Sequence, residues 1–214
     1  AGTTGGQSLS IEGDATLDVV GASKALSTLS VTGSATLKGD VSTTATQHYT
    51  GKLVIDTDTV LRASSVALAN GVGGTTTGGQ SLRIEGDAII GGGQGITAAL
   101  SSFTVAGSTR LDGGSLVTTG EQHYLGAVTL AGNHSLTSTG GSLSFGSSID
   151  SSNRSSLTLA AGQAIRVDGA VGARSPLGTL RLDAGDSIDF AANVHVGSVQ
   201  QAAAGGLTRF SGDL

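Results

Sequence analysis

Two histidines within a repeated tripeptide are the first candidates for chemistry in this chain. The tripeptides are Gln47-His48-Tyr49 and Gln122-His123-Tyr124, and histidine is the side chain best suited to proton transfer or metal binding near neutral pH. They occupy the same place in two repeats, about three turns of a stacked fold and roughly 14 Å apart, too far for one zinc ion with ligands at about 2 Å. We therefore predict that glutamine amides satisfy loop carbonyls and that tyrosine rings pack on the next turn. The predicted structural corner motifs comprise Gln47, His48, Tyr49, Gln122, His123 and Tyr124.

Paired carboxylates are the second candidate site. They occur as Glu12-Gly-Asp14 and Glu85-Gly-Asp87, and such pairs can serve acid–base hydrolysis or bind calcium. Glu-Gly-Asp is also common in turns, and a turn does not hold two carboxylates at a catalytic separation. We therefore predict solvated turn acids, no metal site and no catalytic residue.

Composition excludes several further functions. The chain has 214 residues, 11 Lys and Arg against 16 Asp and Glu, and no cysteine, so it offers no disulfide and no thiolate metal ligand. No run of basic residues is available to neutralise phosphates, so we expect no nucleic-acid partner. No apolar stretch approaches the ~20 residues that span a bilayer. The glycine-rich Gly5-Gly-Gln7 and Gly78-Gly-Gln80 lack the lysine and helix of a phosphate loop, so we expect no cofactor.

The elements that must position these side chains are predicted by one recurring pattern. In Leu9-Ser10-Ile11-Glu12-Gly13-Asp14-Ala15-Thr16-Leu17, two short alternating segments flank a turn at Gly13. Each segment places its apolar side chains on one side. A single L-shaped unit cannot bury this side alone, but a stack of such units can.

The pattern returns along the whole chain, at steps of about 20, 24 and 29 residues that recur in this order. Together they form a super-repeat of about 75 residues, in which the sequence from Gly5 to Ala15 reappears from Gly78 to Ala88. We expect Leu9, Leu29, Leu53 and Leu82 to lie above one another along one axis. The copies begin at Leu9, Leu29, Leu53, Leu82, Phe103, Val128, Leu157, Leu180 and Leu207.

The sequence therefore predicts an all-β protein, a right-handed parallel β-helix (β-solenoid) of about nine coils in super-repeats of three. We expect one domain over residues 1–214, with super-repeats at about 1–76, 77–152 and 153–214. We also expect a fragment of a longer protein, because neither end has a polar cap.

The repeats resemble those of the filamentous-haemagglutinin family. The resemblance is carried by the Leu-x-Val-x-Gly-x-x-x-Leu pattern, by the Gly-Gly-Gln-Ser-Leu-x-Ile openings and by the segments Thr43 to Gly51 and Thr118 to Gly126, which share Gln-His-Tyr-x-Gly. The third copy departs, because Gln201 is followed by Ala202-Ala203-Ala204. The resemblance implies a secreted bacterial exoprotein of two-partner secretion, displayed on the cell surface, with an outer-membrane secretion partner and no catalytic residue.

The leading functional hypothesis is a structural and adhesive shaft segment that attaches to a protein or glycan of host cells or to other surfaces, and we expect a monomer. Loops within 62–79 and 138–156 are the expected contact surfaces. The alternatives are a β-helix enzyme acting on polysaccharide and a pure spacer with binding elsewhere. The enzyme would need acids, basic residues and aromatic rings gathered on one face over two or three coils.

Overall fold

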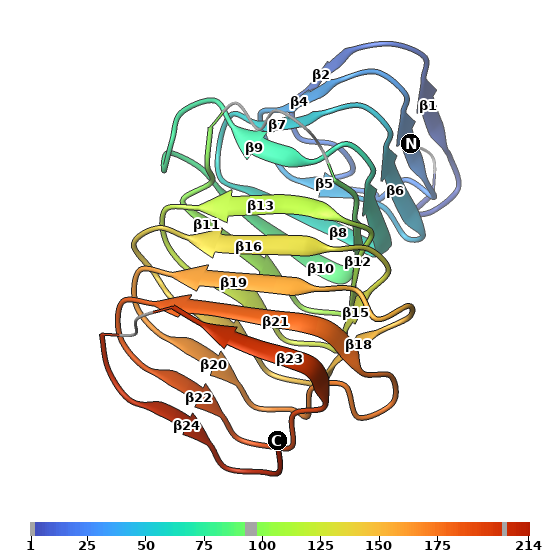
Figure 1. Ribbon diagram of the computed structural model, residues 1–214. Helices are drawn as coiled ribbons and strands as arrows, with labels where there is room; N and C mark the ends of the chain where they lie inside the picture. The colour runs from blue at the N-terminus through green and yellow to red at the C-terminus, as the bar shows by residue number, and fades with distance from the viewer. Residues whose placement is uncertain (1–2, 93–97, 203–204) are drawn as a thin grey trace.

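The chain folds into a stack of parallel β-strands wound in successive coils (Figure 1). The computed structural model describes residues 3–92, 98–202 and 205–214. These residues form 24 strands and no helix, so none of them belongs to a helix that could cross a membrane. The strand pairs are parallel throughout, which confirms the predicted all-β parallel β-helix.

Most strands are three to five residues long because each coil turns a corner between its faces. In Leu29-Ser30-Val31 the two apolar side chains are buried and the serine between them is half-buried. The same alternation in successive coils builds one core of stacked aliphatic side chains. We number the faces in the order in which the chain visits them.

Face 1 contains the C-terminal halves of two long strands, and bridges from Ile149 to Val171 and on to Val194 extend it. Its strands are β1 (Leu9–Ile11), β3 (Leu29–Val31), β6 (Thr46–Tyr49), β8 (Thr59–Leu68), β10 (Ser81–Ile90), β12 (Thr109–Leu111), β15 (Val128–Leu130) and β18 (Ile149–Ser151).

Face 2 has two runs of strands that are joined through residues 98–100. The Gly74 N–H donates to the Ala98 carbonyl, and Leu100 bridges to Thr118. The strands are β2 (Ala15–Leu17), β4 (Ala35–Leu37), β7 (Leu53–Ile55), β9 (Val72–Gly74), β13 (Gly114–Thr118), β16 (His134–Ser138), β19 (Leu157–Ala161), β21 (Leu177–Ala184) and β23 (Val196–Gln201).

Face 3 contains the N-terminal halves of the same two long strands, β8 and β10, which pass from Face 3 to Face 1 without a break. Its other strands are β5 (Val41–Ser42), β11 (Ser102–Val105), β14 (Gln122–Tyr124), β17 (Leu143–Phe145), β20 (Ile165–Val167), β22 (Ile188–Phe190) and β24 (Thr208–Phe210).

The coils are more uniform than the sequence spacing predicts. Within the described residues, Face 1 has ten positions in register, each about 20 residues after the last, so the stack has about ten coils rather than nine of unequal length. These positions are Leu9, Leu29, Gln47, Val66, Ala88, Thr109, Val128, Ile149, Val171 and Val194.

The prediction that four leucines lie above one another is only partly right. Leu9 pairs with Leu29, but Gln47 follows Leu29. Leu53 lies on Face 2 after Ala35, and Leu82 lies on Face 3. The recurring sequence pattern covers two adjacent faces while a coil has three, so copies can begin on any face. The steps of about 20, 24 and 29 residues correspond to three, four and four faces.

The super-repeat therefore spans eleven strand positions, which is three coils and two further faces. Leu9 begins one copy on Face 1 and Leu82 begins the next on Face 3. The Gln-His-Tyr motifs follow the same rule, with Gln47 on Face 1 and Gln122 on Face 3. Gln201 of the third copy lies on Face 2. Each copy is thus rotated by one face relative to the previous copy.

Aromatic rings fill part of the core in the C-terminal half. Tyr124 and Phe145 stack with centroids 5.0 Å apart, and Phe103 contacts the same tyrosine ring at 6.0 Å. Phe190 and Phe210 form a second stack at 5.1 Å. Because strands of neighbouring coils are in register, equivalent rings meet face to face between coils.

Candidate functional site

The structure places the glutamine and tyrosine of each tripeptide in the core and the histidine outside. Gln47 and Tyr49 are 1% and 0% exposed, and Gln122 and Tyr124 are both 0% exposed. His48 and His123 point outward because strand residues alternate. The prediction that the two histidines occupy one column three coils apart is wrong. His48 lies on Face 1, and His123 lies on Face 3.

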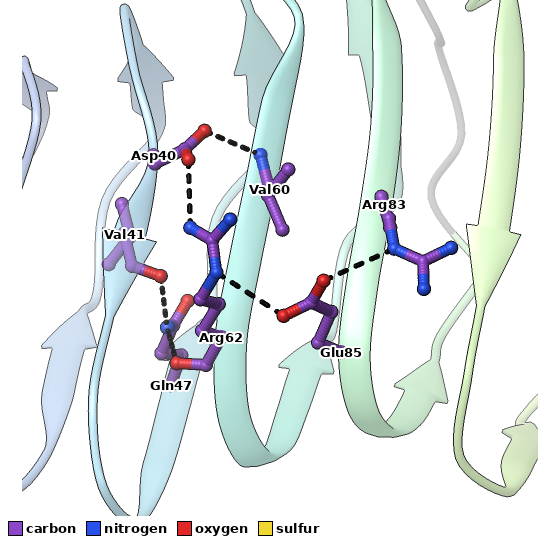
Figure 2. A network of polar contacts seen from close by, with 7 residues as sticks. All are labelled: Asp40, Val41, Gln47, Val60, Arg62, Arg83 and Glu85. Atoms are coloured by element: carbon purple, nitrogen blue, oxygen red, sulfur yellow. Dashed lines mark hydrogen bonds and ion pairs between the residues drawn. The ribbon is translucent and has the colours of Figure 1, made fainter.

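Each buried glutamine connects neighbouring coils through its carboxamide. Gln47 Nε2 donates to the carbonyls of Val41 and Arg62, both at 3.0 Å (Figure 2). The Tyr49 hydroxyl donates to Gln47 Oε1 at 3.1 Å. Val41 precedes the glutamine in the chain, whereas Arg62 belongs to the next coil. The carboxamide therefore adds hydrogen bonds between the two coils at this corner, beside the backbone bond that the Thr43 N–H donates to the Arg62 carbonyl.

The second motif reproduces this arrangement on another face. Gln122 Nε2 donates to the Thr137 carbonyl at 2.9 Å and to Thr118 Oγ1 at 3.2 Å, and the Tyr124 hydroxyl donates to Gln122 Oε1 at 2.9 Å. Burial raises the pKa of Tyr124 and of Tyr49 above the usual tyrosine range, so both hydroxyls remain protonated donors. The motif thus works in the same way on two faces of the stack.

The glycine that follows each motif is required by close contact between coils. A Cβ on Gly126 would lie 2.3 Å from the Gly107 carbonyl oxygen, and a Cβ on Gly51 would lie 2.3 Å from that of Gly33. We expect Gly126→Ala to lower the free energy of unfolding by about 1–2 kcal/mol, because backbone atoms must move to admit the methyl group. Urea titration checks this, with Gly146→Ala as the control, because Gly146 has no positive φ and the atom nearest to its added Cβ would be the Leu125 carbonyl oxygen at 3.2 Å.

Acidic and amide side chains at the corners form a regular set of contacts that sequence reasoning did not identify. Asp14 Oδ1 accepts from the Ser34 N–H, and Asp87 Oδ1 accepts from the Ser108 N–H, both at 2.8 Å. The predicted turn acids therefore connect one coil to the next. The other aspartate and asparagine side chains that accept from a backbone N–H one coil later are Asp40, Asp58, Asn133, Asp150 and Asn193.

An ionic network crosses Face 3 near the long strands (Figure 2). Arg62 pairs with Asp40 at 2.8 Å and with Glu85 at 3.2 Å, and Glu85 also pairs with Arg83 at 3.3 Å. Partial burial raises the pKa of Asp40, but hydrogen bonds from the Arg62 guanidinium and the Val60 N–H outweigh it and leave the pKa below its usual value. The network joins three consecutive coils.

Removing the Arg62 side chain should have a small effect on stability. Its side chain is 45% exposed, and ion pairs at such positions contribute about 0–1 kcal/mol. We expect Arg62→Ala to lower the free energy of unfolding by less than about 1 kcal/mol, with a smaller difference at high salt. Denaturation at two ionic strengths measures both effects, and a loss above about 2 kcal/mol would contradict this account.

Ionisable side chains continue along the outer surface of Face 3. His123 Nε2 lies 2.7 Å from Glu121 Oε2, and Arg166 contacts Asp168 at 2.7 Å and Asp189 at 3.5 Å. The central outward row of this face, in register from coil to coil, is Arg83, Thr104, His123, Ser144, Arg166, Asp189 and Arg209. We call this row the Face 3 polar row.

Face 2 contrasts with Face 3. Its central outward row is uncharged until Asp183 on β21. The residues before that point are Thr16, Thr36, Val54, Gly73, Val117, Thr137 and Ala160. The central outward row of Face 3 therefore carries more charge than that of Face 2, and the enzyme alternative required charged residues on one face over two or three coils. The aromatic rings that an enzyme acting on polysaccharide would also need are absent from the Face 3 polar row, because both tyrosines are buried.

The expected contact loops contain several strands. The segment 62–79 contains the end of β8 and all of β9, and 138–156 contains β17 and β18. Each segment contains short strands because it belongs to two coils of ordinary length and not to one long coil. Connections without strand structure remain at 69–71, 75–79, 139–142, 146–148 and 152–156.

No family model, curated protein or solved structure matches this chain. Within the described residues, no group of three or more histidine, aspartate or glutamate side chains is arranged to hold a metal ion.

Proposed function

We propose that this chain is a structural and adhesive shaft segment of a secreted bacterial surface protein. The observation that carries the proposal is the stack of about ten coils, in register along Face 1 in the described residues, over one largely aliphatic core. Such a stack extends by adding coils, and it holds its surface residues in fixed positions. The resemblance of the repeats to the filamentous-haemagglutinin family supports secretion through an outer-membrane partner and display at the cell surface.

The Face 3 polar row is the proposed contact surface for a protein or glycan of the target cell. It offers arginine, histidine, serine and aspartate side chains at the spacing of parallel strands, about 4.8 Å. Repeated donors and acceptors of this kind suit a polar, extended partner. Face 2 offers no comparable set of charges over its first coils.

A matched pair of variants tests this proposal. The triple variant Arg83→Gln, Arg166→Gln, Arg209→Gln removes three charges from Face 3, and Thr36→Glu, Thr137→Glu, Thr158→Glu makes the same net change on Face 2. We expect binding of the labelled 214-residue chain to host cells and glycan arrays to fall at least about tenfold in the first variant only. Equal losses would contradict a role for Face 3, and no binding by the unmodified chain would favour the spacer alternative.

A further inference from the structure

Three side chains on Face 3 form a hydrogen-bonded series across two coils. Ser144 Oγ lies 2.5 Å from His123 Nδ1, and His123 Nε2 lies 2.7 Å from Glu121 Oε2. When Nε2 carries the proton and donates to Glu121, Nδ1 accepts from the Ser144 hydroxyl. An acid thus orients the imidazole, and the imidazole is positioned to take the serine proton. This is the arrangement of an activated nucleophile.

The fold does not require this series, as the first Gln-His-Tyr motif shows. Thr46 stands before Gln47 where Glu121 stands before Gln122, and Ala67 lies opposite His48 where Ser144 lies opposite His123. His48 Nδ1 instead lies 3.2 Å from Thr50 Oγ1. The structural part of the motif is therefore kept in both copies, whereas the acid and the hydroxyl occur only in the second.

Ser144 lies partly exposed on the outer surface of Face 3. The His123 and Glu121 side chains are 37% and 58% exposed, so a solute can reach them. Arg166 lies directly opposite Ser144 on the next strand, but its guanidinium is paired with Asp168 and Asp189, so we assign it no part in the reaction. The backbone N–H groups of these strands are engaged in the sheet and do not form an oxyanion hole.

We propose that Ser144 is an acyl-accepting nucleophile, with His123 as its general base and Glu121 as the residue that orients the base. Ser144 Oγ attacks the carbonyl carbon of a small carboxylic ester, and its proton passes to His123 Nδ1. The bond from carbon to the leaving oxygen then breaks, and the leaving alcohol takes the proton from His123. The products are O-acylated Ser144 and the free alcohol. The acylated serine is an alkyl ester with a poorer leaving group than an activated aryl ester, so its hydrolysis is slower than its formation from such an ester and the adduct accumulates.

Acetylation by p-nitrophenyl acetate tests the proposal on the intact chain. We expect one acetyl group per chain by intact mass, located on Ser144 by peptide mapping, and no adduct at this position in Ser144→Ala. His123→Asn should slow the modification of Ser144 at least about tenfold, because general-base catalysis contributes about 10²–10⁴-fold. Glu121→Gln should slow it severalfold.

The first motif provides the matched control. His48→Asn should leave the acetylation of Ser144 unchanged, and circular dichroism of every variant should retain the β spectrum because the replaced side chains point outward. Acetyl groups only on lysine, on histidine or on other serines would overturn the proposal. An unchanged rate at Ser144 in folded His123→Asn would overturn it equally. Both results concern the chemistry of Face 3 and leave the adhesive function to its own experiment.

Discussion

Replacing Gln122 with leucine is expected to lower the free energy of unfolding by about 3 kcal/mol. The replacement keeps the approximate size of the side chain but removes the donors to the Thr137 carbonyl and Thr118 Oγ1. It also leaves the buried Tyr124 hydroxyl without its acceptor. Each buried polar group that loses its partner costs about 1–3 kcal/mol, and several are affected together. Chemical denaturation measures the loss.

The third copy of the repeat supplies the control for this prediction. Gln201 occupies the equivalent position on Face 2, but it is exposed and its amide donates to Thr208 Oγ1 at 2.8 Å. Gln201→Leu should therefore change stability by less than about 0.5 kcal/mol. Tyr124→Phe should cost about 1 kcal/mol, since only one hydrogen bond is lost. A Gln122→Leu variant as stable as Gln201→Leu would show that the buried carboxamide does not support the corner.

Acidification from pH 6.5 to pH 4 is expected to destabilise the protein through His134. This side chain is 3% exposed, and neither ring nitrogen has a hydrogen-bond partner of good geometry, with only the Gly113 backbone close enough to act on the ring. Burial lowers its pKa to about 4, although the nearby Gly113 backbone acts in the opposite direction. The unfolded chain binds a proton near pH 6.5 and the folded chain only near pH 4, so stability falls as pH decreases through this window. The loss is about 3 kcal/mol.

The variant His134→Leu isolates this contribution. Leucine occupies the next position of the same column at Leu157, so the apolar side chain suits the site. The difference in unfolding free energy between the variant and the unmodified protein should grow by about 3 kcal/mol from pH 6.5 to pH 4. His48→Gln, at an exposed position, should retain the acid sensitivity of the unmodified protein. Parallel stability curves for the unmodified protein and His134→Leu would contradict the assignment.

The sequence was sufficient to predict the fold class because the alternation of Leu9, Ile11 and Leu17 around a turn is a local signal. The register was not predictable in the same way. Leu29 and Leu53 resemble each other as residues, yet one follows Leu9 on Face 1 and the other follows Ala35 on Face 2. The pattern describes a corner between two faces, and three similar corners occur in each coil. Only the pairing of strands distinguishes them.

The candidate site shows a similar division. Glu121 and His123 are two residues apart, so alternation along a strand indicates that they share the outer surface. Ser144 joins them only if the coil length is known to be 21 residues at this point. The adjacent coils differ by a few residues because their corners differ, so the partner of an outward side chain cannot be chosen from one sequence. The role of Asp14 and Asp87 in joining coils was missed for the same reason.

The super-repeat has eleven strand positions, which is not a whole number of three-face coils. This mismatch determines on which face a repeated surface feature lies. A surface feature encoded once in each super-repeat would point in three directions around the circumference before it returned to its first azimuth. Gln47, Gln122 and Gln201 already mark these three directions. A longer chain of the same repeats would therefore display a repeated feature on all three faces in turn, along a helical path around the stack. Such a feature could contact a neighbouring molecule that approached from any side.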